Sequence, residues 1–131
     1  MILVDSSVWI DYFNGNKTAK SDWLDSSLGN TPIVIGNLIL TEVLQGFQSD
    51  KDFKIAKDLL SGIPFMSMGG QVLAIESAMN YRFLRSKGVT VRKTIDVIIG
   101  TFCIRNQLIL LHDDRDFEPM VKFLGLEIID T

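Results

Sequence analysis

Five short runs rich in apolar residues recur along the chain, and stretches with helical periodicity separate them. The runs lie at residues 2–5, 33–35, 64–68, 108–111 and 126–129. Their residues are mostly apolar in succession rather than in alternation, which is typical of strands buried on both faces. Strands that alternate with helices indicate a parallel sheet with helices packed on both sides. The sequence therefore predicts an α/β fold of three layers (α/β/α), with a central, mostly parallel sheet of about five strands.

The longest helical pattern covers residues 71–87 and ends at Gly88. Its apolar residues recur close to a helical period: Val72, Ile75, Ala78, Met79 and Phe83. That spacing predicts a helix over these residues, with apolar side chains along one face. Polar residues mark other helix ends: we expect Ser6 or Ser7 to be the N-cap of the first helix and Asn37 to be the N-cap of the helix that carries Glu42.

Length and composition indicate one globular domain over residues 1–131. Hydrophobic residues make up 47% of the chain and charged residues 22%, which excludes a disordered protein. No apolar run is long enough to span a bilayer, and the first residues lack the basic start of a signal peptide. A single cysteine, Cys103, cannot form an internal disulfide, and it falls on an apolar helix face. A reducing cytoplasm is therefore the expected location.

Four acidic residues stand where an apolar run or helix meets a loop: Asp5, Glu42, Asp96 and Asp114. Burying a carboxylate is costly unless it is paired or coordinates a cation. Three of the four have no basic run beside them, which favours one shared cation. Ligands that are all oxygen indicate Mg²⁺ or Mn²⁺ rather than Zn²⁺. Metal-assisted hydrolysis of a phosphodiester is the leading hypothesis for the chemistry.

Each acid also has a purely structural interpretation. Asp5 can cap the helix that follows it. Asp96 can interact with the dipole at the first turn of its helix. Asp114 can belong to a solvated turn together with Asp113 and Asp116. Like charges so close raise one another's pKa unless a cation compensates, which favours a metal site over the solvated turn.

Further polar residues are candidates for contacts with substrate. Ser6, Asn37 and His112 can each hydrogen-bond a phosphate oxygen. The net charge of −3 argues against binding nucleic acid by charge alone. Five basic residues nevertheless fall within twelve positions just before the third acid, and they form either a phosphate-contact strip or a solvated helix end. They are Arg82, Arg85, Lys87, Arg92 and Lys93.

Four segments in order resemble the PIN domain family over almost the whole chain. They are VDSSVWI at 4–10, LTEVLQG at 40–46, DVIIG at 96–100 and LHDDRDF at 111–117. Within that family the chain is most similar to the VapC-type toxins of bacterial toxin–antitoxin pairs. Position by position, the resemblance makes Asp5, Glu42, Asp96 and Asp114 the four site acids, with Asp116 as a secondary candidate. His112 departs from the family, which often has Thr or Ser there.

The resemblance implies a Mg²⁺- or Mn²⁺-dependent endoribonuclease that inhibits translation by cutting RNA, such as structured tRNA or rRNA. It also implies inhibition by a small cognate VapB-like antitoxin, and homodimers that pair through their own helices. An aromatic front end, which includes Trp9, Tyr12, Phe13 and Trp23, is either an exposed groove for an amphipathic antitoxin helix or part of the core.

Three alternatives compete with the nuclease hypothesis. A haloacid-dehalogenase-like phosphatase needs a second Asp at position 7, where this chain has Ser7. A receiver domain needs an acidic phosphoacceptor after its third strand, and residues 64–68 offer none. The third alternative is a PIN-like module that binds nucleic acid or protein without nuclease activity. Such a module has usually lost one or more acids, and this chain retains all four.

Overall fold

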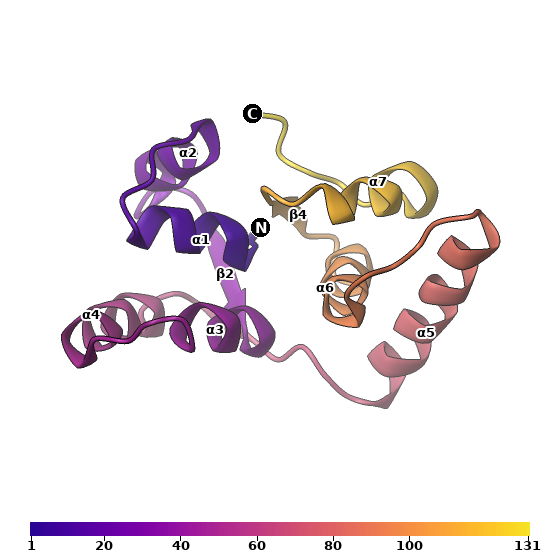
Figure 1. Cartoon of the computed structure of the whole chain (residues 1–131), viewed down its shortest axis with the longest axis horizontal. Coiled ribbons are helices and arrows are strands. Elements are labelled where there is room, and N and C mark those ends of the chain that lie inside the picture. Colours follow the sequence, from indigo (N-terminus) through magenta and orange to yellow (C-terminus); the bar gives the residue numbers. More distant parts are fainter.

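A four-stranded parallel sheet forms the centre of the computed structural model, which describes residues 1–131 (Figure 1). Its strands are β1 (Ile2–Val4), β2 (Ile33–Gly36), β3 (Phe65–Met66) and β4 (Ile109–Leu111), in the order β3-β2-β1-β4. Every neighbouring pair is parallel: Ile2 lies opposite Ile33 on one side and Ile109 on the other. β1 and β2 are buried throughout, as their unbroken apolar character predicts.

The fifth predicted strand is reduced to a single bridge. Leu110 pairs with Ile128 in parallel, and the Leu110 N–H donates to the Glu127 carbonyl at 2.9 Å. The Ile129 N–H donates to the Leu110 carbonyl at 3.0 Å. The expected run at 126–129 therefore lies beside β4 but pairs at one residue only. The prediction of about five strands was one too many.

Two groups of helices flank the sheet, and the strands lie between them (Figure 1). The first group is α1 (Ser6–Phe13), α2 (Ala19–Ser27), α3 (Asn37–Leu44) and α4 (Asp50–Ser61). The second is α5 (Gln71–Ser86), α6 (Thr94–Arg105), the 3₁₀ turn η1 (Arg115–Phe117) and α7 (Glu118–Leu124). This arrangement confirms the predicted three-layer α/β/α class. No helix combines the length and the apolar character that crossing a bilayer requires.

Two predicted helix caps were wrong. Asp5, not Ser6 or Ser7, caps α1: its side chain accepts a hydrogen bond from the Ser7 N–H. Gly36 precedes α3, and Asn37 is the first residue inside that helix. The Asn37 Oδ1 accepts from the Met68 N–H at 2.6 Å instead, which ties the start of α3 to the segment after β3.

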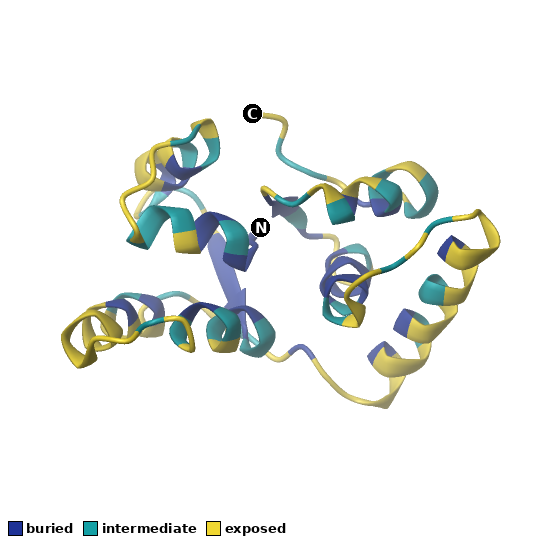
Figure 2. Cartoon of the chain, viewed as in Figure 1, coloured by how far each residue is buried: buried dark blue, intermediate teal, exposed yellow.

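Helix α5 forms where the sequence predicts it, and one of its apolar faces is exposed to solvent. Its apolar residues Val72, Ile75, Met79 and Phe83 are 42–61% exposed, and Ala78 is exposed as well (Figure 2). The buried residues of this helix are Leu73, Ser77 and Leu84. Both sets recur at helical spacing, so the sequence offers two stripes, and only the stripe of Leu73, Ser77 and Leu84 faces the core.

The neighbouring helix α6 lies almost entirely inside the molecule. Seven of its twelve residues are buried, including Asp96 and Cys103. Cys103 is a free thiol in the core, as expected, and burial raises its pKa to about 12. On the other side of the sheet Trp9 is fully buried, so it belongs to the core rather than to an exposed groove. Tyr12 and Phe13 pack against it with their rings partly accessible.

Candidate metal centre

The four sequence-predicted acids line one cavity at the carboxyl ends of β1 and β4. Its lining comprises Asp5, Ser6, Ser7, Ile10, Glu42, Gln45, Lys93, Asp96 and Asp114. This is the edge at which parallel α/β sheets place their working sites. Two hydrogen bonds join the strand ends there: the Asp5 N–H donates to the Leu111 carbonyl at 2.9 Å, and the Asp113 N–H donates to the Ser7 Oγ at 3.1 Å.

Asp5 combines its structural role with a place in the cavity. Its Oδ2 accepts from the Ser7 N–H at 3.2 Å and from the Ser7 Oγ at 2.7 Å. Its Oδ1 is buried and has no hydrogen-bond partner. Burial raises the pKa of this carboxyl above its ordinary value, and the hydrogen bonds from Ser7 only partly oppose that rise. One oxygen therefore serves the helix while the other remains free for a ligand.

Glu42 reaches the cavity from the second turn of α3. Its Oε1 accepts a hydrogen bond from the Ser6 Oγ at 3.2 Å, and Ser6 is itself buried. Burial, followed by the negative charge of Asp5, raises the pKa of Glu42. A Glu on a helix surface is ordinarily inert, but this one shares its electrostatic environment with a second carboxylate.

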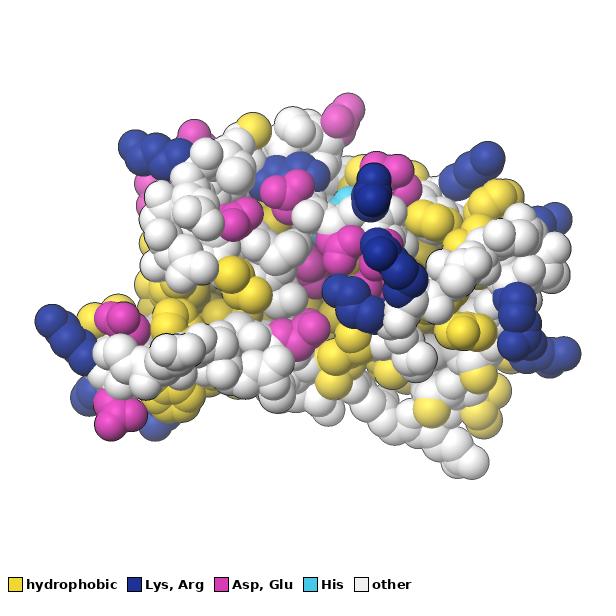
Figure 3. Space-filling view, in the orientation of Figure 1, with side chains coloured by type: hydrophobic (Ala, Val, Ile, Leu, Met, Phe, Trp, Pro, Cys, Tyr) yellow, Lys and Arg dark blue, Asp and Glu magenta, His cyan; other side chains and the backbone are white.

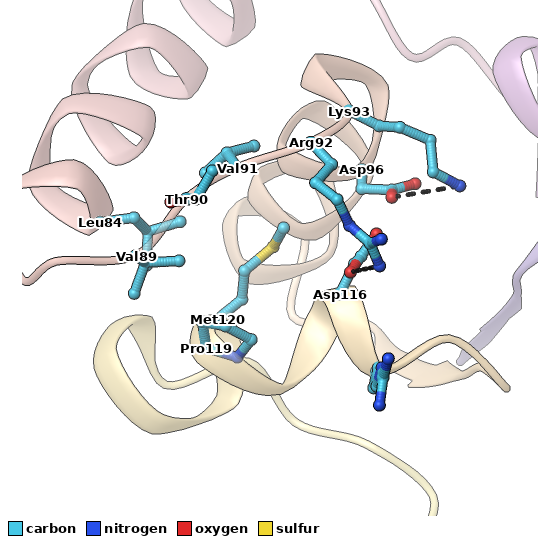
Figure 4. Close-up of a pocket in the computed structure, with 11 residues that line it drawn as sticks. Leu84, Val89, Thr90, Val91, Arg92, Lys93, Asp96, Asp116, Pro119 and Met120 are labelled. Atoms are coloured by element: carbon cyan, nitrogen blue, oxygen red, sulfur yellow. Dashed lines mark hydrogen bonds and ion pairs between the residues drawn. The ribbon is translucent and has the colours of Figure 1, made fainter.

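Asp96 is the second acid of the cavity that is almost fully buried. It lies in the first turn of α6 and is 4% exposed, and its Oδ2 has no hydrogen-bond partner. The Lys93 Nζ lies 3.7 Å from that oxygen (Figure 4). Burial raises the pKa of Asp96 to about 6; Lys93 opposes the rise, and the neighbouring carboxylates reinforce it.

The loop after β4 presents Asp114 and Asp116 and turns Asp113 toward solvent. The Asp114 Oδ1 accepts from the Asp116 N–H at 2.9 Å, which caps η1, and its Oδ2 lies 3.4 Å from the Lys93 Nζ. Burial acts to raise the pKa of Asp114, but the Asp116 N–H and Lys93 outweigh it, and the pKa falls. Carboxylate oxygens of Asp96, Asp114 and Asp116 lie within 4.8 Å of one another.

The secondary candidates separate into those at the cavity and those beside it. Ser6 lines the cavity, whereas Asn37 is engaged by Met68 and does not. His112 is buried behind the loop: its Nδ1 accepts from the Asp114 N–H at 3.1 Å, so it holds the loop that presents the fourth acid. Burial, aided by the positive charge of Lys20, lowers the pKa of His112.

The predicted basic strip divides into two parts. Arg92 and Lys93 lie beside the acids, and the Arg92 guanidinium pairs with the Asp116 Oδ1 at 2.8 Å (Figure 4). The remaining three belong to α5 and its end, where Arg85 lies over the Tyr81 ring and Lys87 over the Phe83 ring. Acidic side chains gather near the middle of the face in Figure 3, with Lys and Arg side chains directly beside them.

Two lining residues of the cavity, Ile10 and Gln45, and one residue outside its lining, Lys20, were not expected from the sequence. Ile10 lies one turn along α1 from Ser6 and Ser7, and Gln45 lies one turn along α3 from Glu42. Side chains three or four residues apart on a helix share a face, so the spacing of Ile10 from Ser6 and of Gln45 from Glu42 could have predicted both positions. Lys20 of α2 donates to the His112 carbonyl across the chain, and nothing in its local sequence predicts that contact.

The residues of the cavity fit a divalent cation. Asp5 and Asp96 each keep a buried carboxylate oxygen without a hydrogen-bond partner, a costly arrangement unless a cation satisfies it. The donors are all oxygen, the set that Mg²⁺ and Mn²⁺ prefer. Lys93 is the one basic side chain in the lining, against four carboxylates.

Comparison with known proteins gives a consistent result. The family model described as PIN domain matches residues 2–122. Ribonuclease VapC11 of Mycobacterium tuberculosis is 27% identical over 129 residues, which cover 97% of this chain and 96% of the relative. VapC ribonuclease Mb1587 of Mycobacterium bovis matches with the same identity and the same coverage.

Solved structures share the fold at low sequence identity. VapBC2 from Rickettsia felis, bound to a DNA fragment from its promoter, has a TM-score of 0.78 and 15% identity, covering 100% of this chain and 99% of that one. DNA-bound VapBC from Salmonella typhimurium has a TM-score of 0.75 and 18% identity, covering 99% and 98%. At these identities the likeness concerns the fold alone.

Proposed function

This chain belongs to the PIN domain family, and we propose that it is a metal-dependent endoribonuclease that acts as the toxin of a toxin–antitoxin pair. The observation that carries the proposal is the meeting of Asp5, Glu42, Asp96 and Asp114 in one cavity, two of them with an unsatisfied buried oxygen. Relatives named VapC ribonucleases, matched along nearly their whole length, support the same activity. The proposed substrate is RNA, and its cleavage would stop translation.

Asp5, Asp96 and Asp114 are the proposed ligands of Mg²⁺ or Mn²⁺, and Glu42 is the fourth acid of the site. Bound there, the cation supplies Lewis-acid charge neutralisation at the scissile phosphate. Asp116 is held by Arg92, so we place it at the edge of the site, where it supports the turn of Asp114.

The other side chains orient this set and receive the substrate. Ser6 fixes the carboxylate of Glu42, which is then placed to accept a proton from the attacking nucleophile. Ser7 holds one oxygen of Asp5 and the loop before Asp114 at the same time. The cations of α5, such as Arg82, are exposed outside the cavity lining and are proposed to contact the RNA backbone.

A small VapB-like antitoxin is the proposed partner. Solved relatives of the same fold are VapBC complexes, which supports a partner of this kind. Tyr12, Phe13 and Phe47 are half-buried aromatic residues that pack edge to face, and Ile10 is 40% exposed at the cavity rim. This partly open apolar surface suits the apolar face of an amphipathic helix. The cytoplasm is the proposed place for both toxin and antitoxin.

A homodimer that pairs through α5 is also part of the proposal. Val72, Ile75, Met79 and Phe83 form an exposed apolar stripe, defined here as the α5 stripe. An uncharged stripe can pack against its own copy across a two-fold axis, because each partner offers the same apolar surface. Two copies would then remove from water the side chains that the folded monomer leaves exposed.

The decisive experiment is cleavage of a mixed pool of structured RNAs by purified, antitoxin-free protein with Mg²⁺, with Mn²⁺ or with EDTA. Asp5→Asn is compared with Asp113→Asn, which removes an exposed charge from the loop after β4, outside the cavity lining. We expect metal-dependent cleavage that Asp5→Asn loses and Asp113→Asn keeps. If Asp5→Asn cleaves as well as the wild type, the metal-centre assignment fails. RNA binding without cleavage under every condition would favour the alternative function, a PIN-like binding module.

A further inference from the structure

Lys93 is the one cation among the lining residues of the acidic cavity. It is the residue before α6, and its ammonium lies 3.7 Å from the Asp96 Oδ2 and 3.4 Å from the Asp114 Oδ2. Asp96 belongs to α6, and Figure 4 shows its contact with Lys93, whereas Asp114 belongs to the loop after β4. One lysine therefore bridges two of the carboxylates proposed to hold the metal.

The Lys93 ammonium lies next to a carboxylate oxygen that has no hydrogen-bond donor. The Asp96 Oδ2 is buried and has no hydrogen-bond partner, and Lys93 lies just beyond hydrogen-bonding reach of it. The Lys93 side chain is 53% exposed, so its stem is free to swing out into solvent. Arg92, the preceding residue, is instead fixed on Asp116 at the outer edge, which leaves Lys93 as the cation that faces the cavity.

We propose that Lys93 is a built-in competitor of the divalent cation, and that its ammonium must leave Asp96 and Asp114 before metal binds. This inference rests on the proposed function, and it adds a determinant of metal affinity that the four acids alone do not supply. A site with four carboxylates and no internal cation would bind metal more tightly and would be less stable without it. Lys93 thus lowers metal affinity and stabilises the metal-free protein.

The test is direct Mn²⁺ binding, measured by electron paramagnetic resonance of the free ion at fixed ionic strength. Lys93→Gln is compared with wild type and with Lys87→Gln, which removes the same charge at the end of α5. We expect Lys93→Gln to bind Mn²⁺ more tightly by on the order of tenfold, because a unit charge near 4 Å is removed from a partly screened site. Lys87→Gln should bind as the wild type does.

A second readout separates competition from simple damage. Without metal, Lys93→Gln should unfold at a lower temperature than wild type, and Mn²⁺ should raise its unfolding temperature by more. Lys93→Arg keeps the charge and should restore the weaker, wild-type-like Mn²⁺ affinity. Circular dichroism checks that each variant is folded.

The outcomes distinguish this inference from the proposed function. Unchanged or weaker Mn²⁺ binding by Lys93→Gln, while the wild type binds, overturns the role of Lys93 and leaves the metal centre intact. Equal tightening in Lys87→Gln shows a general charge effect and also overturns it. If Lys93→Gln binds Mn²⁺ and the wild type does not, Lys93 excludes the metal completely and the competition is supported. Absence of Mn²⁺ binding in every variant overturns both the metal centre and the competition.

Discussion

Helices α5 and α6 are neighbours in sequence and pack against each other, yet they relate to the core in opposite ways. α6 is buried along most of its length and carries an acid, Asp96, into that apolar environment. α5 buries only Leu73, Ser77 and Leu84 and turns an uncharged apolar stripe to water (Figure 2). Charged side chains are ordinarily exposed and large apolar ones buried. α6 departs from this rule by burying a carboxylate, and α5 departs from it by exposing apolar side chains.

The buried acid of α6 and the exposed stripe of α5 each indicate a missing partner. A carboxylate without a partner in the core indicates a missing cation, and an apolar stripe without cover indicates a missing surface. Either departure costs stability in the isolated monomer, so both are expected to be functional. Substitution of Asp96 in α6 should therefore change RNA cleavage, and substitutions in the α5 stripe should change dimer formation.

The largest effect is expected at the buried end of α6. Asp96→Asn keeps the shape of the side chain but removes the charge that would hold the cation. Loss of several kcal/mol of charge stabilisation corresponds to a fall in RNA cleavage on the order of a thousandfold. Single-turnover cleavage of a fixed RNA measures it. The comparison fails if Asp96→Asn cleaves at the wild-type rate while it remains folded.

On α5 a charge should separate the proposed dimer. Ile75→Glu puts a carboxylate in the middle of the stripe, and we expect the dissociation constant of the dimer to rise about a hundredfold. Light scattering after size exclusion should then report the 14.7 kDa monomer. Ile55→Glu on α4 is the matched control, because Ile55 and Ile75 are both 54% exposed. If Ile55→Glu and Ile75→Glu change the dissociation constant of the dimer equally, the assignment of the dimer interface to α5 fails.

The acid of α6 should also tune stability with pH. The pKa of Asp96 is about 6 in the folded protein against 3.8 as its ordinary value, so the folded state binds this proton more tightly than the unfolded state. Ionisation between about pH 4 and pH 6 therefore destabilises the fold, and the loss levels off above pH 6. In EDTA, Asp96→Asn should be more stable than wild type by about 2 kcal/mol at neutral pH, with the difference vanishing near pH 4. Urea unfolding at several pH values measures this, and a difference independent of pH would contradict the raised pKa.

The smallest effect concerns the buried side of α5. The Ser77 Oγ is buried and has no hydrogen-bond partner, so Ser77→Ala should stabilise the protein by about 1 kcal/mol. Ser26→Ala in α2 is the control for helix propensity, since Ser26 is exposed. Both are measured by urea unfolding. A destabilised Ser77→Ala would mean that the hydroxyl has a partner, such as a buried water.

The sequence was sufficient for the class of fold and for the edge at which the acids meet. Unbroken apolar runs such as 2–5 predict buried parallel strands, and an acid at the end of such a run must lie at the carboxyl edge of the sheet. Asp5 and Asp114 follow directly from this rule. Glu42 follows less directly, because its place depends on which face of α3 turns toward the sheet.

The rest depends on tertiary contacts that local patterns do not contain. α5 carries two helical stripes, and only its packing on α6 decides that Leu73 faces inward and Ile75 outward. Lys93 was a candidate for RNA contact because its sequence neighbours are basic, and local sequence does not predict that its ammonium lies 3.7 Å from the Asp96 Oδ2. The role of His112 depends on a backbone N–H two residues away, which composition does not reveal.

The position of β1 within the sheet has a consequence for synthesis of the chain. β1 is made first, but it lies between β2 and β4, and the hydrogen bond from the Asp113 N–H to the Ser7 Oγ joins residues 106 positions apart. Chains emerge and fold from the amino terminus onward, and contacts of such long range form late. The cavity therefore lacks its fourth acid, Asp114, until β4 and the loop after it have left the ribosome and β4 has paired with β1.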